Sequence, residues 1–301
     1  MHDIRMLALL ELLYGSGLRA TELVSLPRNA IHPDRPFLIL KGKGGRERLV
    51  LATKVAGKGQ VIRPGQPVTG ATMREAVEAS LKRLGTDYID LYQLHWPNRG
   101  SYHFRQSWHY APKGIDKAAE TANMTDILTT AQALVAEGKI RAIGLSNEST
   151  WGAARWLHLA EVLGLPQMAT VQNEYSLLCR QFDTDWAELS VAEDMPLLAF
   201  SPLATGLLSG KYAGDVIPEG SRRSLNPDLS GRITARVFPA VAAYLGVAAR
   251  HGIDPCQMAI AFCRTRPFPT IPIIGATTLD QLKTNIGAAE VTLSSEVLDD
   301  I

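Results

Sequence analysis

From Leu51 onward, short apolar runs alternate with longer segments in which apolar residues recur every three or four positions. The runs are LVLATKV, YIDLYQLH, IRAIGLS, ATVQNEY, PLLAFSP and TIPIIGA, and each ends in a polar or glycine-containing turn. Runs that are apolar along their whole length indicate strands buried on both faces, as in a parallel sheet covered by helices. The pattern therefore predicts about six βα units between residues 51 and 301.

The intervening segments carry helix signals. In TMREAVEASLKRLG, Thr72 is the predicted N-cap, Glu75 completes a capping box and Gly85 ends the helix. Three further helices are predicted in the segments TDILTTAQALVAEGK, TWGAARWLHLAEVLG and TLDQLKTNIGAAE. The alternation of these helices with the apolar runs favours an α/β fold.

The first 50 residues have a different pattern. A leucine-rich helix, IRMLALLELLYGSG, is closed by glycine, and RATELVSL begins a second helix. PFLIL and RERLV flank the turn KGKGG, which predicts a β-hairpin. We therefore expect residues 1–50 to form a small helical and β-hairpin segment, separate from a barrel domain over residues 51–301.

Composition and charge exclude several classes of protein. The chain is 46% hydrophobic and 20% charged, as in a folded domain, and its net charge of +1 provides no global field for nucleic acid or an anionic membrane. No apolar run reaches the ~18 residues of a membrane-spanning helix. The three cysteines form no CxxC pair, which favours reduced thiols in the cytoplasm over disulfides, and we expect no metal site.

Two polar residues end otherwise apolar strands: Lys54 in LATKV and His95 in LYQLHWP. In a parallel β/α barrel, this end of the strands carries the catalytic residues, and an unpaired lysine buried elsewhere in the wall would be costly. We therefore predict that Lys54 and His95 are catalytic. For His95 alone, the alternative is a structural, hydrogen-bonded histidine.

The later strand ends suggest a cofactor site. GLSN and QNEYS supply amide, hydroxyl and aromatic groups that can hold a carboxamide and stack on a flat ring. The loop FSPLATGLLSGKY can wrap a pyrophosphate, and IIGATTLDQLKTN opens a helix whose first N–H groups suit an anion. The alternative for the last motif is an ordinary N-cap at Thr278.

In this order, ATKVAG, SLKRLGTDYIDLYQLHWP, GKIRAIGLSNE, QNEYSLLCR, FSPLATGLLSGKY and IGATTLDQLKTNI resemble an aldo-keto reductase, closest to the Tas-like branch, over residues 51–301. The resemblance implies a TIM barrel that binds NADP(H) without a Rossmann motif and reduces a small-molecule carbonyl. Lys54 and His95 would be two members of the Asp–Tyr–Lys–His tetrad. Tyr175 would stack on the nicotinamide.

The resemblance assigns the other contacts to the cofactor residue by residue. The carboxamide would be held by Ser146, Asn147 and Gln172. The diphosphate would be lined by Ser201, Leu203, Gly206, Leu208 and Lys211. The adenosine phosphate end would be held by Gly275, Thr277, Gln281 and Asn285.

The chain departs from this family at its N-terminal end. The family Asp and Tyr precede the lysine, and no recognisable equivalents occur here; Tyr14 in YGSG is a superficial match to the tyrosine segment. Instead, LLELLYGSGLRATELVSL and ILKGKGGRERLV resemble the catalytic domain of a Xer-type tyrosine recombinase, with Arg19 and Lys43 matching catalytic positions. The chain thus resembles an N-terminally truncated reductase fused to a recombinase fragment.

The leading hypothesis is an NADPH-dependent oxidoreductase with an incomplete TIM barrel of about six strands and impaired activity, because a proton-donating tyrosine is missing. The alternative is a DNA-binding or strand-exchange protein. The +3 charge of residues 1–50 is small for phosphate binding, so we do not expect a nucleic-acid partner. The carbonyl substrate and the oligomeric state are not specified by the sequence.

Overall fold

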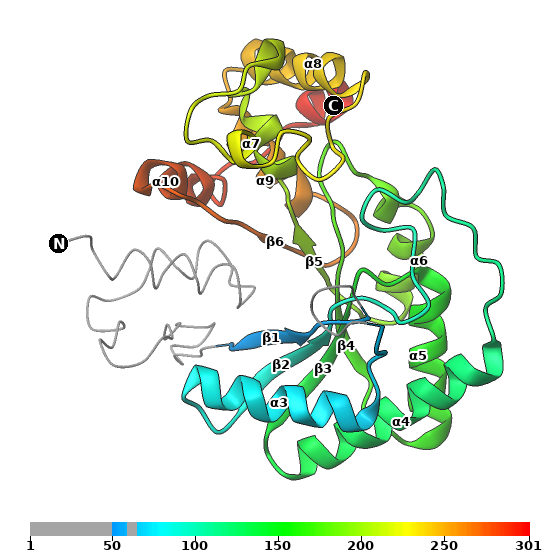
Figure 1. Cartoon of the computed structure of the whole chain (residues 1–301). Helices are drawn as coiled ribbons and strands as arrows, with labels where there is room; N and C mark the ends of the chain where they lie inside the picture. Colours follow the sequence, from blue (N-terminus) through cyan, green and yellow to red (C-terminus); the bar gives the residue numbers. More distant parts are fainter. Residues whose placement is uncertain (1–49, 59–64) are drawn as a thin grey trace.

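The computed structural model describes residues 50–58 and 65–301. Six parallel strands form one sheet in the order of the sequence, which confirms the six predicted βα strands (Figure 1). The strands are β1 (Ala52–Val55), β2 (Ile89–Leu94), β3 (Ile140–Ser146), β4 (Met168–Gln172), β5 (Leu197–Phe200) and β6 (Thr270–Ile273).

Helices cover the outer side of the sheet. The α-helices are α3 (Gly70–Leu84), α4 (Lys117–Ala136), α5 (Thr150–Leu163), α6 (Asp185–Ala192), α7 (Arg222–Leu225), α8 (Val237–Arg250), α9 (Pro255–Arg264), α10 (Leu279–Gly287) and α11 (Ser295–Asp300). The 3₁₀ turns are η1 (Gln181–Asp183), η2 (Ala204–Ser209) and η3 (Ala213–Asp215). In Figure 1, α3, α4 and α5 lie along β1–β4, and α8 and α9 lie beyond β5 and β6.

The N-terminal boundary of α3 differs from its prediction. Its N-cap is Thr69, whose side chain accepts from the Thr72 N–H, and the Thr72 hydroxyl accepts from the Thr69 N–H at 2.9 Å. The predicted N-cap, Thr72, is therefore the third helical residue. The Gly70 N–H donates to Asp126 on α4 at 2.6 Å, so a tertiary contact fixes the earlier start. The predicted stop at Gly85 is confirmed, with φ 63°.

The two faces of the sheet bury different residues. The large core lies between the sheet and the helices. A smaller cluster on the inner face joins Ala52, Leu91 and Leu198. Because side chains alternate along a strand, the residues two positions further on, including Lys54 and Phe200, share this inner face near the carboxyl ends of the strands.

The sheet is an incomplete barrel. Within residues 50–58 and 65–301, β1 pairs only with β2 and β6 pairs only with β5. The predicted helices and hairpin of residues 1–50 lie outside the described residues, apart from Val50. The boundary at residue 51 stays a prediction. None of the helices in the described part is both long and apolar enough to cross a membrane.

Candidate active site

Lys54 and His95 lie at the carboxyl ends of adjacent strands. The His95 N–H donates to the Val55 carbonyl at 3.0 Å, which holds the end of β2 against β1. Burial lowers the pKa of Lys54. Burial, followed by the positive charge of Lys54, lowers the pKa of His95 to about 4. The imidazole is therefore neutral at neutral pH, and it lies within electrostatic range of the lysine.

The low histidine pKa predicts a pH dependence of stability. His103 is also buried, and burial lowers its pKa to about 4 as well. Between the unfolded value of about 6.5 and about 4, the unfolded chain binds more protons than the folded chain. We therefore expect the free energy of unfolding to fall as the pH is lowered through this range.

Urea denaturation at several pH values between about 7 and 5 measures this slope. His95→Gln is expected to reduce the slope, because the variant no longer carries this buried imidazole. Equal slopes for wild type and His95→Gln would show that His95 titrates normally in the folded chain.

Three predicted carboxamide-binding residues lie together beside His95. The Ser146 hydroxyl and the Asn147 N–H donate to the Gln172 carbonyl at 2.9 and 3.0 Å. The Asn147 Nδ2 donates to the His95 carbonyl at 3.0 Å. The Asn147 Oδ1 is buried and has no hydrogen-bond partner among the described residues. A buried acceptor of this kind fits a carboxamide N–H of a nicotinamide.

Tyr175 does not present an open ring face. Its side chain is 0% exposed, and its ring stacks on Phe262 at 6.2 Å between centroids. Its hydroxyl donates to Asp183 Oδ1 at 2.5 Å, and burial raises its pKa. This placement is at odds with the predicted stacking of Tyr175 on a nicotinamide, because the ring belongs to the core behind the strand ends.

Phe200 is an aromatic residue at the strand ends that the sequence motifs did not single out. It ends β5, is only half-buried, and lies two positions after Leu198, so it shares the inner face with Lys54. Gln93, in register with Lys54, was also missed; it is fully buried, and its Oε1 has no partner among the described residues. Because residues two positions apart on a strand share a face, the buried Leu91 and Leu198 would have pointed to Gln93 and Phe200.

The predicted diphosphate residues lie on the turn that follows β5. Ser201 has φ 56° and Gly206 has φ 95°. A Cβ at Gly206 would lie 2.7 Å from Lys211 Cε, so glycine lets the lysine lie close against the turn. Leu203 is half-buried, but Leu208 is 2% exposed, so Leu208 could contribute only its backbone to a diphosphate site.

The four residues predicted for the adenosine phosphate end form two pairs, one at the start of α10 and one further along it. Gln281 Oε1 accepts from the Thr277 N–H at 2.9 Å, and the Asn285 Nδ2 donates to the Gly275 carbonyl at 3.2 Å. Thr278 is the N-cap, and its hydroxyl accepts from the Gln281 N–H. The structure thus joins these residues in two pairs, and Thr278 also forms the ordinary N-cap.

Trp96 lies beside His95, and Phe104 lies against Trp96. The Trp96 ring centroid is 4.6 Å from that of His95 and 6.0 Å from that of Phe104. All three residues belong to the connection between β2 and α4. No group of three or more His, Cys, Asp or Glu in the described ranges is arranged to hold a metal ion. The recombinase-like candidates Arg19 and Lys43 lie outside the described residues.

Comparisons with known proteins agree with this arrangement of motifs. The Aldo/keto reductase family matches residues 37–301. Protein tas of Escherichia coli (strain K12) is 44% identical over 265 residues, covering 86% of this chain and 75% of the relative. An aldo-keto reductase of Babesia bovis is 36% identical, covering 79% of this chain and 88% of the relative. The oxidoreductase YrpG of Bacillus subtilis (strain 168) is 33% identical, covering 86% of this chain and 72% of the relative.

The family match begins earlier in the chain than the resemblance over residues 51–301. It begins at residue 37, so it includes part of the segment assigned to a recombinase fragment, among it the hairpin lysine Lys43. The comparisons provide no evidence for a tyrosine recombinase fusion. The matched range covers more than half of the chain and contains all six strands. The chain therefore belongs to the aldo/keto reductase family.

Proposed function

We propose that the chain is an NADPH-dependent carbonyl reductase that binds its cofactor but turns over substrate slowly. The main support is the buried Oδ1 of Asn147 beside His95, which has no hydrogen-bond partner within residues 50–58 and 65–301. A buried acceptor without a partner is costly, and a ligand N–H at this position would satisfy it. Ser146 and Gln172 lie next to Asn147 and are hydrogen-bonded to each other. Phe200 is a candidate to contact the nicotinamide ring in place of Tyr175.

The protein side chains divide the chemistry between them. The cofactor, when bound, supplies a hydride to the carbonyl carbon of the substrate. The neutral His95 orients the carbonyl oxygen by a hydrogen bond, and the Lys54 ammonium stabilises negative charge that develops there. Because its pKa is lowered to about 4, His95 is a poor source of the proton at neutral pH.

The proposed loss of turnover comes from the lack of a group that gives this proton to the substrate. The family tyrosine that gives it, and its aspartate partner, have no recognisable equivalents in the sequence. General-acid catalysis typically contributes ~10²- to 10⁴-fold in rate. The phosphate-binding and carboxamide-binding groups all lie after residue 140, so they are independent of the residues that are missing.

We therefore expect NADPH to bind with little reduction of a test aldehyde. Energy transfer from tryptophan to the reduced nicotinamide measures binding, and Trp96 beside His95 is a suitable donor. Asn147→Gly removes the amide but tolerates φ 50°, so it should weaken binding without unfolding the chain. A parallel titration with NADH tests the preference for NADPH. Absence of binding contradicts the cofactor proposal, and robust turnover contradicts the proposed loss of the proton donor.

We further propose that residues 51–301 form the barrel domain and that the protein is cytoplasmic. The three cysteines are free thiols, and Cys263 is fully buried. Free thiols are usual in a reducing compartment.

A further inference from the structure

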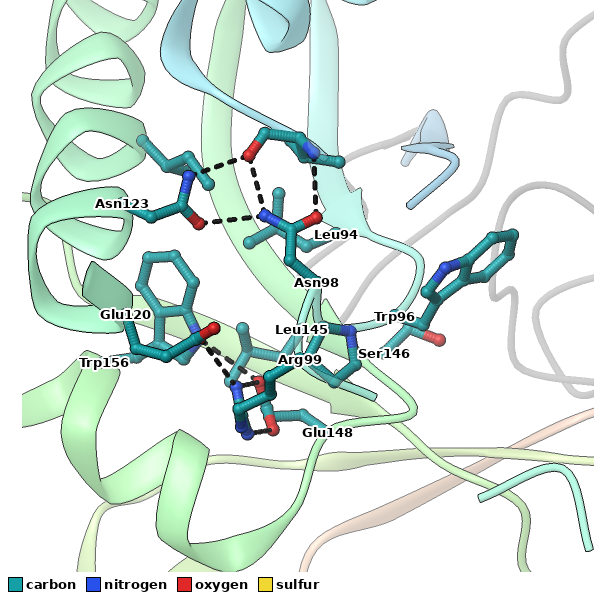
Figure 2. Close-up of a pocket in the computed structure, with 13 residues that line it drawn as sticks. Leu94, Trp96, Asn98, Arg99, Glu120, Asn123, Leu145, Ser146, Glu148 and Trp156 are labelled. Carbon is teal, nitrogen blue, oxygen red and sulfur yellow. Dashed lines mark hydrogen bonds and ion pairs between the residues drawn. The ribbon is translucent and has the colours of Figure 1, made fainter. Parts of the chain in front are cut away.

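A buried carboxylate follows the carboxamide-binding residues directly. The Glu148 side chain is 3% exposed, and it forms an ion pair with Arg99, whose side chain is 5% exposed. Figure 2 shows the two side chains side by side at the edge of a hollow that Ser146 also lines. Neither residue belongs to the predicted cofactor contacts. Burying an ion pair beside the loop that carries Ser146 and Asn147 is costly, because both charges lose their hydration. We therefore expect this pair to have a role in the loop.

The carboxylate of Glu148 is fully engaged within the protein. Arg99 donates to both oxygens, with Nη1 3.3 Å from Oε2. The Ser149 N–H donates to Oε1 at 2.7 Å, and the Trp156 Nε1 donates to Oε2 at 3.3 Å. Glu148 is thus unsuited to act as a base or to hold a ligand. Its contacts connect the loop after β2, through Arg99, with the first turns of α5.

The backbone of the same residue is held from the loop after β4 and again from the connection after β2. The Glu148 N–H donates to Asn173 Oδ1 at 3.2 Å, and its carbonyl accepts from Asn173 Nδ2 at 3.1 Å. The carbonyl also contacts His103 Nε2 at 2.9 Å. One residue earlier, the Asn147 carbonyl accepts from the Ser101 hydroxyl at 2.9 Å. Contacts from the ends of β2 and β4 therefore converge on Asn147 and Glu148.

The backbone of Asn147 requires such support. Its φ of 50° is in the left-handed region, which asparagine tolerates better than most residues but which still costs energy. This conformation directs the amide so that Nδ2 reaches the His95 carbonyl while Oδ1 stays unpaired among the described residues. A small rotation of the loop would move Oδ1 away from this position.

The hollow itself is a weaker candidate for a ligand site. Asn98 and Asn123 are paired with each other and with the Val68 backbone, as the dashed lines in Figure 2 show. Arg99 and Glu148 are likewise satisfied. With these polar groups engaged, the lining serves to join the loop after β2 to α4 and α5.

We propose that the Arg99–Glu148 pair is a positioning device that holds Asn147 in its left-handed conformation for the nicotinamide carboxamide. The proposal rests on the proposed cofactor function, but the positioning can be measured without cofactor. Loss of the pair should release the loop of residues 144–149 and remove the hydrogen bond to the carboxamide. One such bond corresponds to a loss of affinity on the order of tenfold.

The variants Glu148→Gln and Gly152→Ala test this in two different ways. Glu148→Gln removes the charge at nearly constant shape. Gly152→Ala keeps both charges, but its Cβ would overlap the Arg99 guanidinium and the Glu148 carboxylate. The matched control is Gly70→Ala, whose Cβ would overlap Thr130 and Asp126 away from this loop. Glu148→Asp is expected to restore part of the effect, since it retains the charge.

Two readouts separate the possible failures. In the chain without cofactor, hydrogen–deuterium exchange over residues 144–149 should accelerate in Glu148→Gln and Gly152→Ala but not in Gly70→Ala. In the NADPH titration, the Kd should rise about tenfold in the same two variants and stay unchanged in the control. If Glu148→Gln fails to fold, the result for Gly152→Ala tests the proposal alone.

If exchange accelerates in the variants but the wild type does not bind NADPH, the cofactor proposal fails and the positioning of the loop stands. Unchanged exchange in folded variants overturns the positioning role.

Discussion

Replacing Tyr175 with alanine is expected to lower the free energy of unfolding by about 3–5 kcal/mol, as for other buried aromatic residues truncated to alanine. The ring is 0% exposed and contacts Phe262, Phe182 and Phe268 at centroid distances of 6.2, 6.4 and 5.8 Å. Alanine would leave a cavity in this cluster, which rigid neighbours fill only in part. Such a loss is a large fraction of the ~5–15 kcal/mol that stabilises a typical domain.

Urea denaturation measures the effect, and Tyr175→Phe is the matched control. Phenylalanine fills the same space and loses only the hydrogen bond to Asp183, which still pairs with Arg180 at 2.6 Å. We expect this variant to lose about 1 kcal/mol. If Tyr175 were instead a cofactor contact, both variants would fold as stably as the wild type, and NADPH affinity alone would fall in Tyr175→Ala.

A second large loss of stability is expected for Glu174→Leu. Glu174 follows β4, its side chain is 6% exposed, and it pairs with Arg105 and with Arg232, the latter at 3.1 Å. Leucine would remove the carboxylate that pairs with both guanidinium groups in the described part of the chain, where their side-chain exposures are 26% and 12%. Removing one partner of a buried pair typically costs ~3–5 kcal/mol, and the partial exposure of Arg105 favours the lower end of that range.

The double variant Glu174→Leu with Arg105→Met provides the internal test. It removes one of the two unpaired charges, so it should recover part of the lost stability. Glu137→Gln, which removes a surface partner of Arg74, should leave the urea midpoint close to that of the wild type. Equal midpoints for Glu174→Leu and Glu137→Gln would show that the cluster contributes little to stability.

Glu174 also explains how the connection between β2 and α4 is held. Arg105 lies on this connection with φ 68°, and Arg232 precedes α8. Both arginines meet the carboxylate at the end of β4, so one residue joins segments about 70 and 60 positions away in the sequence. Sequence motifs gave no indication of this cluster, because QNEYS was interpreted only through its amide and aromatic residues.

The predicted site residues differ in how far the local sequence placed them. A local pattern was sufficient to place Lys54 and His95 at the carboxyl ends of adjacent strands. It was also sufficient to bring Thr277 and Gln281 together within a single helix turn. Their roles stay predictions. Local pattern was insufficient for Tyr175, because whether an aromatic ring after a strand faces the mouth or the core depends on the helices that pack against it. Phe262 and Phe268, which enclose the ring, come from a segment about 90 residues later.

The sequence by itself determined the six strands, their parallel order and the polar residues at their carboxyl ends. Alternation of apolar runs and helix signals is set by the backbone geometry of strands and helices, which repeats over a few residues and can be recognised without tertiary contacts. Only the tertiary structure decided three features of the site. These are the Asn147 amide oxygen, which has no partner among the residues that the structure describes, the Arg99–Glu148 pair and the burial of Tyr175. These features depend on contacts between loops that are distant in the chain, and desolvation and hydrogen-bond pairing at such contacts have no local signature in the sequence.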